Sequence, residues 1–124
     1  MTTLNYLLLA VTSPRQSAKL YTEILGAQPV QNSETFVLYV LPSGLKIGLW
    51  VKEEMEPMTG KPDGLDISFS EPDKAAVSAT YAAWKAFGLT ILQEPVDMDF
   101  GFTFTAADPD GHRLRVFTLA DNPR

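Results

Sequence analysis

The chain has 124 residues, no cysteine and a formal net charge of -5. Its length fits one domain with a core of its own, and the absence of cysteine excludes disulfides and thiolate chemistry. The acidic balance argues against nucleic-acid binding, which depends on cationic side chains that neutralise phosphates. No apolar run approaches the roughly 18 residues of a membrane helix, and the first residues lack the basic and apolar regions of a signal peptide. We therefore expect a cytoplasmic protein that binds neither nucleic acid nor membranes.

The first half of the chain predicts a strand, a helix and three further strands. The expected ranges are a strand over 4–11, a helix over 13–26, a short strand over 27–30, and a hairpin of strands over 36–41 and 45–51. Ser13 can cap the helix, Pro14 suits its first position, and Gly26 can end it. Residues 52–64 contain two prolines, two glycines and three glutamates, which indicate a surface connection.

The second half of the chain repeats this order of elements. The expected ranges are a strand over 65–70, a helix over 71–88, a strand over 89–96, and a hairpin of strands over 100–107 and 112–117. The last hairpins align without a gap, "PSGLKIGLW" (42–50) over "PDGHRLRVF" (109–117). Two unrelated hairpins could share nine similar residues, but the common order of elements favours internal duplication.

A duplicated βαβββ unit in so short a chain resembles the vicinal oxygen chelate superfamily, which includes glyoxalase I, bleomycin-resistance proteins and extradiol dioxygenases. The stretch "DPDGHRLRVF" (108–117) is similar to the family's final turn and strand, and "SPRQSAKLYTEILG" (13–26) to its first helix. The resemblance implies an α+β fold, with two βαβββ modules whose curved mixed sheets surround a central cavity, often completed by a homodimer. We expect a single glyoxalase-like domain over 1–124, with module one at about 1–52, a linker at about 53–63 and module two at about 64–124.

Alternation along the strands separates a helix-packed face from a second face. The second face is expected to carry Tyr6, Gly48, Trp50, Asp66, Ser68, Arg115 and Phe117. Phe100 and Phe102 belong to a strand that is expected to close one end of the cavity. Aromatic, small and charged residues together are typical of a small-molecule site, so these nine residues are the predicted ligand-binding set.

Metal-dependent members of the family place His, Glu or Gln at one position on each of four strands. By resemblance those positions fall on Tyr6, Gly48, Asp66 and Arg115. Only Asp66 can bind a metal, whereas a divalent site needs three or four protein ligands. We therefore expect no metal and no cofactor, which argues against a glyoxalase or dioxygenase mechanism. Arg115 and Asp66 are expected to pair with each other when no ligand is bound.

Three further side chains have competing interpretations. His112 is interpreted as a turn residue that hydrogen-bonds the backbone of 108–111, rather than as a base or metal ligand. Trp84 is expected in the core, because it shares a helix face with Tyr81. Trp50 is interpreted as a stacking surface, since Gly48 would leave room beside it for a flat molecule. A core or dimer-interface position is the alternative for Trp50.

The sequence is most similar to the metal-free bleomycin- and phenazine-resistance type proteins, which bind an aromatic antibiotic at a dimer interface. The leading hypothesis is a metal-free homodimer that sequesters a planar aromatic ligand. Tyr6 and Trp50 would stack on this ligand, and Arg115 and Asp66 would orient it. One alternative is an isomerase or lyase with Asp66 as general base, and another is an interaction module with a filled cavity.

Overall fold

The computed structural model describes residues 2–120, which form two compact units that divide between Gly60 and Lys61. Each unit has the order strand, helix, strand, strand, strand, as the sequence predicts. The division lies inside the predicted linker at 53–63. No helix among the described residues is both long and apolar enough to cross a membrane.

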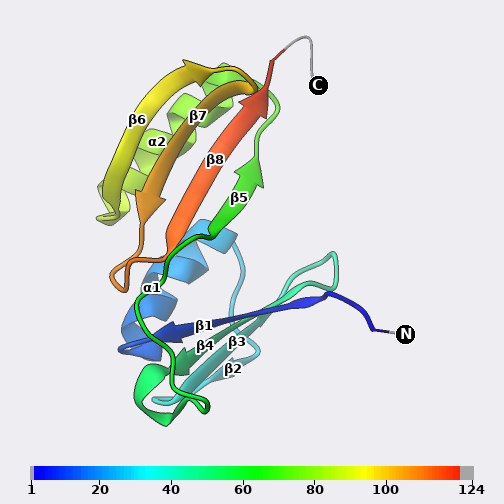
Figure 1. Ribbon diagram of the computed structural model, residues 1–124. Helices are drawn as coiled ribbons and strands as arrows, with labels where there is room; N and C mark the ends of the chain where they lie inside the picture. The colour runs from blue at the N-terminus through cyan, green and yellow to red at the C-terminus, as the bar shows by residue number, and fades with distance from the viewer. Residues whose placement is uncertain (1, 121–124) are drawn as a thin grey trace. The chain divides into compact units, whose positions relative to one another are not determined.

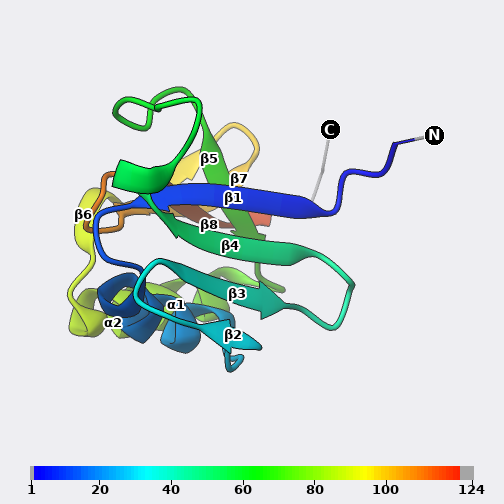
Figure 2. The same ribbon diagram turned by 90° about the horizontal axis from the view of Figure 1, so that it is seen from below.

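The first unit is a four-stranded mixed sheet with one α-helix and one short 3₁₀ helix (Figure 1). Its elements are β1 (Tyr6–Val11), α1 (Pro14–Leu25), β2 (Gln31–Asn32), β3 (Phe36–Val40), β4 (Lys46–Val51) and a short helix η1 (Lys52–Glu54). The strands lie in the order β1-β4-β3-β2, which is visible side by side in Figure 2. β1 is parallel to β4, and the other pairs are antiparallel.

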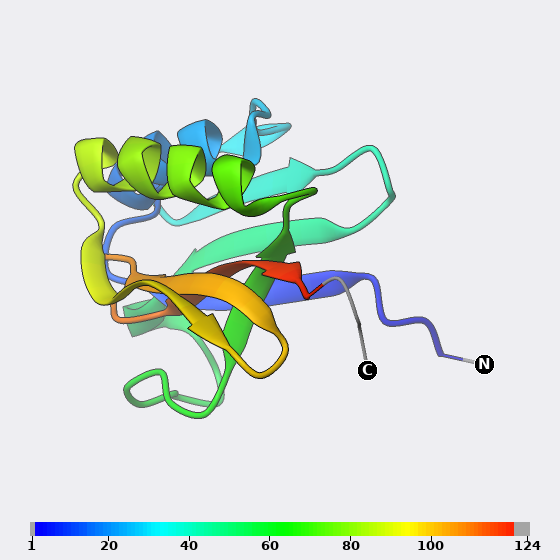
Figure 3. The same ribbon diagram turned by 90° about the horizontal axis from the view of Figure 1, so that it is seen from above.

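The second unit repeats this plan. Its elements are β5 (Asp66–Ser70), α2 (Lys74–Phe87), β6 (Thr90–Met98), β7 (Gly101–Ala107) and β8 (Arg113–Leu119). The strand order is β5-β8-β7-β6, with β5 parallel to β8, and α2 lies over one face of the sheet (Figure 3). The fold is therefore α+β, as predicted, with two mixed sheets that are not closed into barrels.

Helix α1 begins and ends where its sequence predicts. The Ser13 hydroxyl accepts a hydrogen bond from the backbone N–H of Gln16 at 3.3 Å, and Pro14 occupies the first turn. Gly26 ends the helix with φ +62°, and its N–H donates to the carbonyl of Thr22. A left-handed residue at this position favours glycine, because other residues meet a Cβ penalty there.

Helix α2 begins three residues later than the predicted start at 71. The N–H of Glu71 donates to the carbonyl of Phe117 at 2.8 Å, so this residue continues the pairing of β5 with β8. Asp73 is the N-cap, and its carboxylate accepts from the N–H of Ala76 at 2.8 Å. The helix therefore starts only after the chain has left the sheet edge.

The predicted strand over 27–30 is misplaced, since β2 comprises Gln31–Asn32. Pro29 lacks a backbone N–H and cannot donate to a neighbouring strand. Pairing begins only at Val30, whose N–H donates to the carbonyl of Leu38 at 2.8 Å.

The core of the first unit lies between α1 and its sheet. Val11, Val37, Tyr39 and Leu49 are fully buried on this face, opposite Tyr21 of the helix. The Tyr39 hydroxyl donates to the carbonyl of Ala18 at 3.1 Å and lies 2.8 Å from the Thr22 hydroxyl. Burial raises the pKa of Tyr39, although the hydrogen bond with Thr22 opposes this effect.

The core of the second unit is built around aromatic rings. Trp84 is 4% exposed, and its ring meets Phe69 and Phe104 edge-on, with centroids 5.3 and 5.5 Å away. Edge-to-face pairs of this kind add about 0.5–1.5 kcal/mol to the burial of apolar area. The prediction that Trp84 belongs to the core is confirmed.

Asp108 holds the turn between β7 and β8. Its buried carboxylate accepts from the backbone N–H groups of Asp110 and His112, both at 2.9 Å. Its backbone N–H also donates to the carbonyl of His112 at 3.0 Å. His112 is thus a turn residue, as expected, but in these bonds it contributes its backbone and the aspartate supplies the side chain.

Candidate functional site

The first sheet has a helix-free face that is mostly aromatic and aliphatic. Because strand residues alternate and Leu8 and Leu38 both pair with Gly48, one side of the sheet carries alternate residues of β1, β3 and β4. These are Tyr6, Leu8, Ala10, Phe36, Leu38, Val40, Lys46, Gly48 and Trp50. Tyr6 and Leu8 are about two-fifths exposed. The prediction that Tyr6, Gly48 and Trp50 share one face of the sheet is confirmed.

The space beside Gly48 is filled. A Cβ added at Gly48 would lie 2.9 Å from the Tyr6 hydroxyl, 3.0 Å from Leu8 Cδ1 and 3.1 Å from Tyr6 Cε1. The expectation that this glycine leaves room for a flat molecule beside Trp50 is therefore wrong, because β1 supplies the side chains that occupy it. A glycine here allows the Tyr6 ring to lie close against the β4 backbone.

The second sheet has a helix-free face of opposite character. It carries Asp66 and Ser68 of β5, Gln93 of β6, Thr103 and Thr105 of β7, and Arg113, Arg115 and Phe117 of β8. Ser68 and Thr105 are the direct neighbours of Arg115 on the two flanking strands. Most of this face is polar, which contrasts with the first sheet.

Arg115 is the centre of this polar face. Its Nε donates to Asp66 Oδ2 at 2.9 Å, and its Nη1 donates to Gln93 Oε1 at 3.2 Å and to Thr103 Oγ1 at 3.3 Å. The Arg113 Nε lies 2.7 Å from the other oxygen of Asp66. The predicted pairing of Arg115 with Asp66 is thus confirmed, and one carboxylate holds two guanidinium groups.

These contacts decide the chemistry of Asp66. Burial raises its pKa, but the hydrogen bonds and positive charges of Arg115 and Arg113 outweigh that effect and hold the pKa below the ordinary value of 3.8. A carboxylate whose pKa is held below its ordinary value is a weak general base at neutral pH. Both of its oxygens also have cationic partners already.

Sequence reasoning missed three polar residues that contact this centre or each other. These are Gln93, Thr103 and Thr105. The Thr105 hydroxyl donates to Gln93 Oε1 at 3.1 Å, and the Thr103 hydroxyl, which accepts from Arg115 Nη1, donates to the carbonyl of Val116. The alternating threonines of "FTFTAA" were an available signal. No sequence pattern indicated the position of Gln93, because two register shifts in β6 place this residue opposite Thr105.

The three phenylalanines of the predicted set lie on different faces. Phe100 and Phe117 form an edge-on pair with centroids 6.4 Å apart, so Phe100 lies beside the polar face. Phe102 pairs in register with Thr118, which places it on the helix-covered face, where the Lys74 ammonium lies 5.4 Å from its centroid. Phe102 therefore does not belong with Arg115 and Phe117.

The four positions at which the resemblance places metal ligands do not suit a metal here. Tyr6 packs against Gly48, Arg115 is a cation, and Asp66 is held by two guanidinium groups. Within residues 2–120 no three or more His, Cys, Asp or Glu side chains come together as a metal-binding group. The donors at these positions do not fit a divalent ion.

Comparison with known proteins agrees with this fold. The sequence model of the Glyoxalase/Bleomycin resistance protein/Dioxygenase superfamily matches residues 3–116. The phenazine antibiotic resistance protein EhpR from Enterobacter agglomerans is 28% identical over 118 residues, covering 93% of this chain and 91% of EhpR.

Solved structures share this fold. A protein from Agrobacterium tumefaciens, determined by solution NMR, is 45% identical with a TM-score of 0.89, and the match covers 97% of this chain and 99% of that one. A glyoxalase-related enzyme from Fulvimarina pelagi has a TM-score of 0.85 at 18% identity, covering 95% and 88% of the two chains. At 18% identity, the similarity to the Fulvimarina pelagi protein concerns the fold alone.

Proposed function

This chain belongs to the glyoxalase/bleomycin resistance protein/dioxygenase superfamily, and we propose that within it the chain is a metal-free binding protein for a planar aromatic small molecule. The observation that carries the proposal is the ion pair of Arg115 with Asp66 at 2.9 Å. Arg115 and Asp66 occupy two of the positions expected for metal ligands, and here they bind each other instead of a metal. The 28% identity to a phenazine antibiotic resistance protein supports an aromatic ligand of antibiotic type.

The aromatic groups for stacking lie on the helix-free face of the first sheet. Tyr6 is 38% exposed and Trp50 is half-buried there, so each presents part of its ring. Stacking on such rings contributes about 0.5–1.5 kcal/mol beyond the burial of area. Tyr6 and Trp50 are therefore the proposed stacking surfaces.

The charged groups for orientation lie on the helix-free face of the second sheet. The described residues supply no hydrogen bond to Arg115 Nη2, whereas Nε and Nη1 are bound to Asp66, Gln93 and Thr103. The guanidinium is thus held rigidly with one nitrogen left to donate. A ligand carboxylate or phenolate is the partner that suits it.

The alternative of an isomerase or lyase with Asp66 as base has less support. Its carboxylate has a lowered pKa and accepts from two arginines. A base for proton abstraction works best with a pKa near the working pH. We therefore favour binding over turnover.

Ligand binding is tested by titration with phenazine and phenazine-1-carboxylate. Quenching of tryptophan fluorescence is expected in the wild type and in Trp84→Phe, which keeps only Trp50. By calorimetry, Trp50→Ala and Tyr6→Ala should each bind at least about threefold more weakly, whereas Val30→Ala, at a 66% exposed residue, should bind normally. Arg115→Gln should remove the preference for the carboxylate. Equal affinity in Trp50→Ala and Val30→Ala would contradict the proposed stacking surface.

Metal independence has its own measurement. Binding should be unchanged after dialysis against EDTA, and calorimetry with Ni²⁺ or Zn²⁺ should give no stoichiometric heat. Tight binding of one metal ion per chain, or loss of ligand binding after chelation, would reject the proposal.

We also propose that the chain is a homodimer. The exposed apolar residues of the first sheet's helix-free face, among them Leu8 and Val40 at 41% and 42%, are a surface that association could cover. Light scattering after gel filtration should give twice 13.7 kDa, and a monomer mass at micromolar concentration would refute it.

A further inference from the structure

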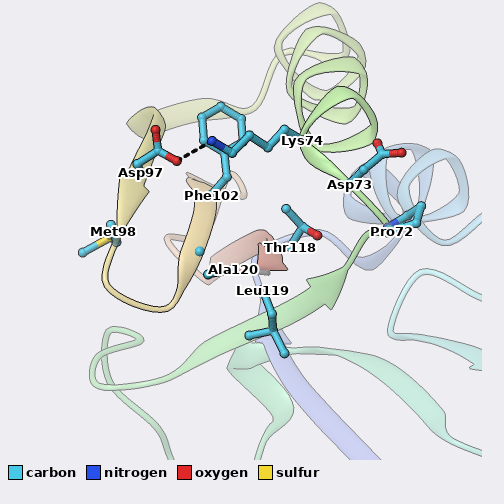
Figure 4. Close-up of a pocket in the computed structure, with 10 residues that line it drawn as sticks. Pro72, Asp73, Lys74, Asp97, Met98, Phe102, Thr118, Leu119 and Ala120 are labelled. Atoms are coloured by element: carbon cyan, nitrogen blue, oxygen red, sulfur yellow. Dashed lines mark ion pairs between the residues drawn. The ribbon is translucent and has the colours of Figure 1, made fainter. Parts of the chain in front are cut away.

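The second unit has a pocket of about 510 Å³ where β6 and β8 end and β7 begins, beside the start of α2 (Figure 4). Its volume lies within the range of small-molecule sites. None of the proposed stacking or orienting residues lines it, although Phe102, from the predicted ligand-binding set, does. An inference about this pocket therefore does not depend on the proposed function.

The ammonium of Lys74 lies between an aromatic ring and a carboxylate in this pocket. Lys74 extends past the Phe102 ring to Asp97 (Figure 4), with its Nζ 5.4 Å from the ring centroid and 2.9 Å from Asp97 Oδ1. An aromatic face together with a carboxylate is the arrangement that recognises organic cations. The structure thus displays an ammonium in its binding geometry.

Lys74 holds this position weakly. Its side chain is 65% exposed and that of Asp97 is 70% exposed. Ion pairs with such exposure contribute little, because water screens them and a long side chain loses its freedom. A ligand ammonium can therefore replace the lysine at low cost, while the lysine remains anchored to α2.

The rest of the pocket suits an apolar body attached to that ammonium. Pro72, Phe102 and Thr118 line it, so the apolar part of a bound molecule would pack against a proline ring, a phenylalanine ring and a threonine methyl group. We propose that this pocket binds a small aryl-alkyl ammonium compound, with Lys74 as an internal competitor for the subsite formed by Asp97 and Phe102.

The opposite reading is that Lys74 serves as a cation for an anionic ligand. The two readings predict opposite effects of removing the lysine charge. An internal competitor weakens binding of an ammonium, so its loss improves affinity. A recognition group strengthens binding of an anion, so its loss reduces affinity.

The test uses the full ¹⁵N-labelled chain, titrated with phenethylamine and followed by amide chemical shifts. The neutral 2-phenylethanol and the anionic 3-phenylpropionate serve as matched probes. Lys74→Met removes the ammonium and keeps an apolar side chain. Lys85→Met is the matched control, because Lys85 lies on the same helix with its Nζ 5.7 Å from the Tyr81 ring centroid and outside this pocket.

Phenethylamine should shift the amides of Gly101, Phe102 and Thr118, with affinity roughly threefold higher in Lys74→Met than in the wild type. Lys85→Met should match the wild type. Adding Asp97→Asn to Lys74→Met should remove the gain and the preference over 2-phenylethanol. All three positions are on the surface, and unchanged spectra without ligand establish that the variants fold.

Two results would overturn the proposal. One is phenethylamine affinity that is the same in Lys74→Met and the wild type, or shifts that fall outside the pocket. The other is tighter binding of 3-phenylpropionate that disappears in Lys74→Met. Failure of phenazine binding on the helix-free faces would leave this result unaffected.

Discussion

Removing the charge of Asp66 should destabilise the second unit by an amount that the local contacts define. Hydrogen bonds to charged groups contribute about 1.5–3 kcal/mol when buried, and exposed pairs contribute about 0.2–1 kcal/mol. The bond with Arg115, whose side chain is 19% exposed, is nearer the first case, and that with Arg113, 46% exposed, is nearer the second. Since Asp66→Asn keeps one oxygen acceptor, we expect a loss of about 1–2 kcal/mol.

The measurement is urea unfolding of Asp66→Asn and of the control Asp63→Asn, which changes an exposed aspartate three residues earlier. In thermal melts of this 124-residue chain the same loss should lower the Tm by roughly 3–10 °C, whereas the control should change stability by less than about 0.5 kcal/mol.

The stabilisation by Asp66 should depend on pH in a definite direction. The pKa of Asp66 is lower in the folded protein than its ordinary value of 3.8. Its stabilisation is therefore present above that value and is lost as the pH falls through the folded-state pKa. The difference in unfolding free energy between the wild type and Asp66→Asn should be largest at pH 7 and should shrink below pH 3.8. Equal stability of the two variants at pH 7, or a gap that widens in acid, would refute the reasoning.

Three further substitutions test the fold, each by urea unfolding. Gly101→Ala should lower the free energy of unfolding by at least about 3 kcal/mol, because Gly101 has φ +152° and an added Cβ would overlap the backbone carbonyl of Thr118 on the facing strand. At the control position Gly60 an added Cβ meets nothing within 4 Å, so Gly60→Ala should be nearly neutral. Tyr39→Phe should cost about 1–2 kcal/mol by removing a buried hydroxyl with two partners. Since the pKa of Tyr39 is raised, the fold favours its neutral form, and the wild type should lose stability above pH 10 more steeply than Tyr39→Phe. Asp108→Ala should cost about 1–3 kcal/mol, because two backbone N–H groups lose their acceptor, and it should speed amide exchange in the turn.

Local patterns were sufficient for much of this protein. The caps of α1 at Ser13 and Gly26 are local chemistry, because each satisfies backbone groups within a few residues. Alternation along β8 correctly placed Arg115 and Phe117 on the face opposite Leu114, since successive side chains of a strand point to opposite sides. The duplicated order of elements followed from the same local periodicities.

The errors at the candidate site arose where a neighbour from far along the chain decides the outcome. The space at Gly48 depends on the Tyr6 ring of a parallel strand about forty residues earlier. The face of Phe102 depends on its register with Thr118, and the position of Gln93 depends on irregularities in β6. None of these is encoded in the periodicity of a single segment.

By itself, the sequence determined the element order, the caps of α1 and the presence of Arg115 at a position where the resemblance places an acid. Each of these is set by a residue's own chemistry or by neighbours within one turn or strand. Only the tertiary structure decided that Asp66 binds both Arg113 and Arg115 and that Lys74 occupies a site between Phe102 and Asp97. Such contacts depend on strand register and on the packing of a helix against its sheet, which no local pattern specifies.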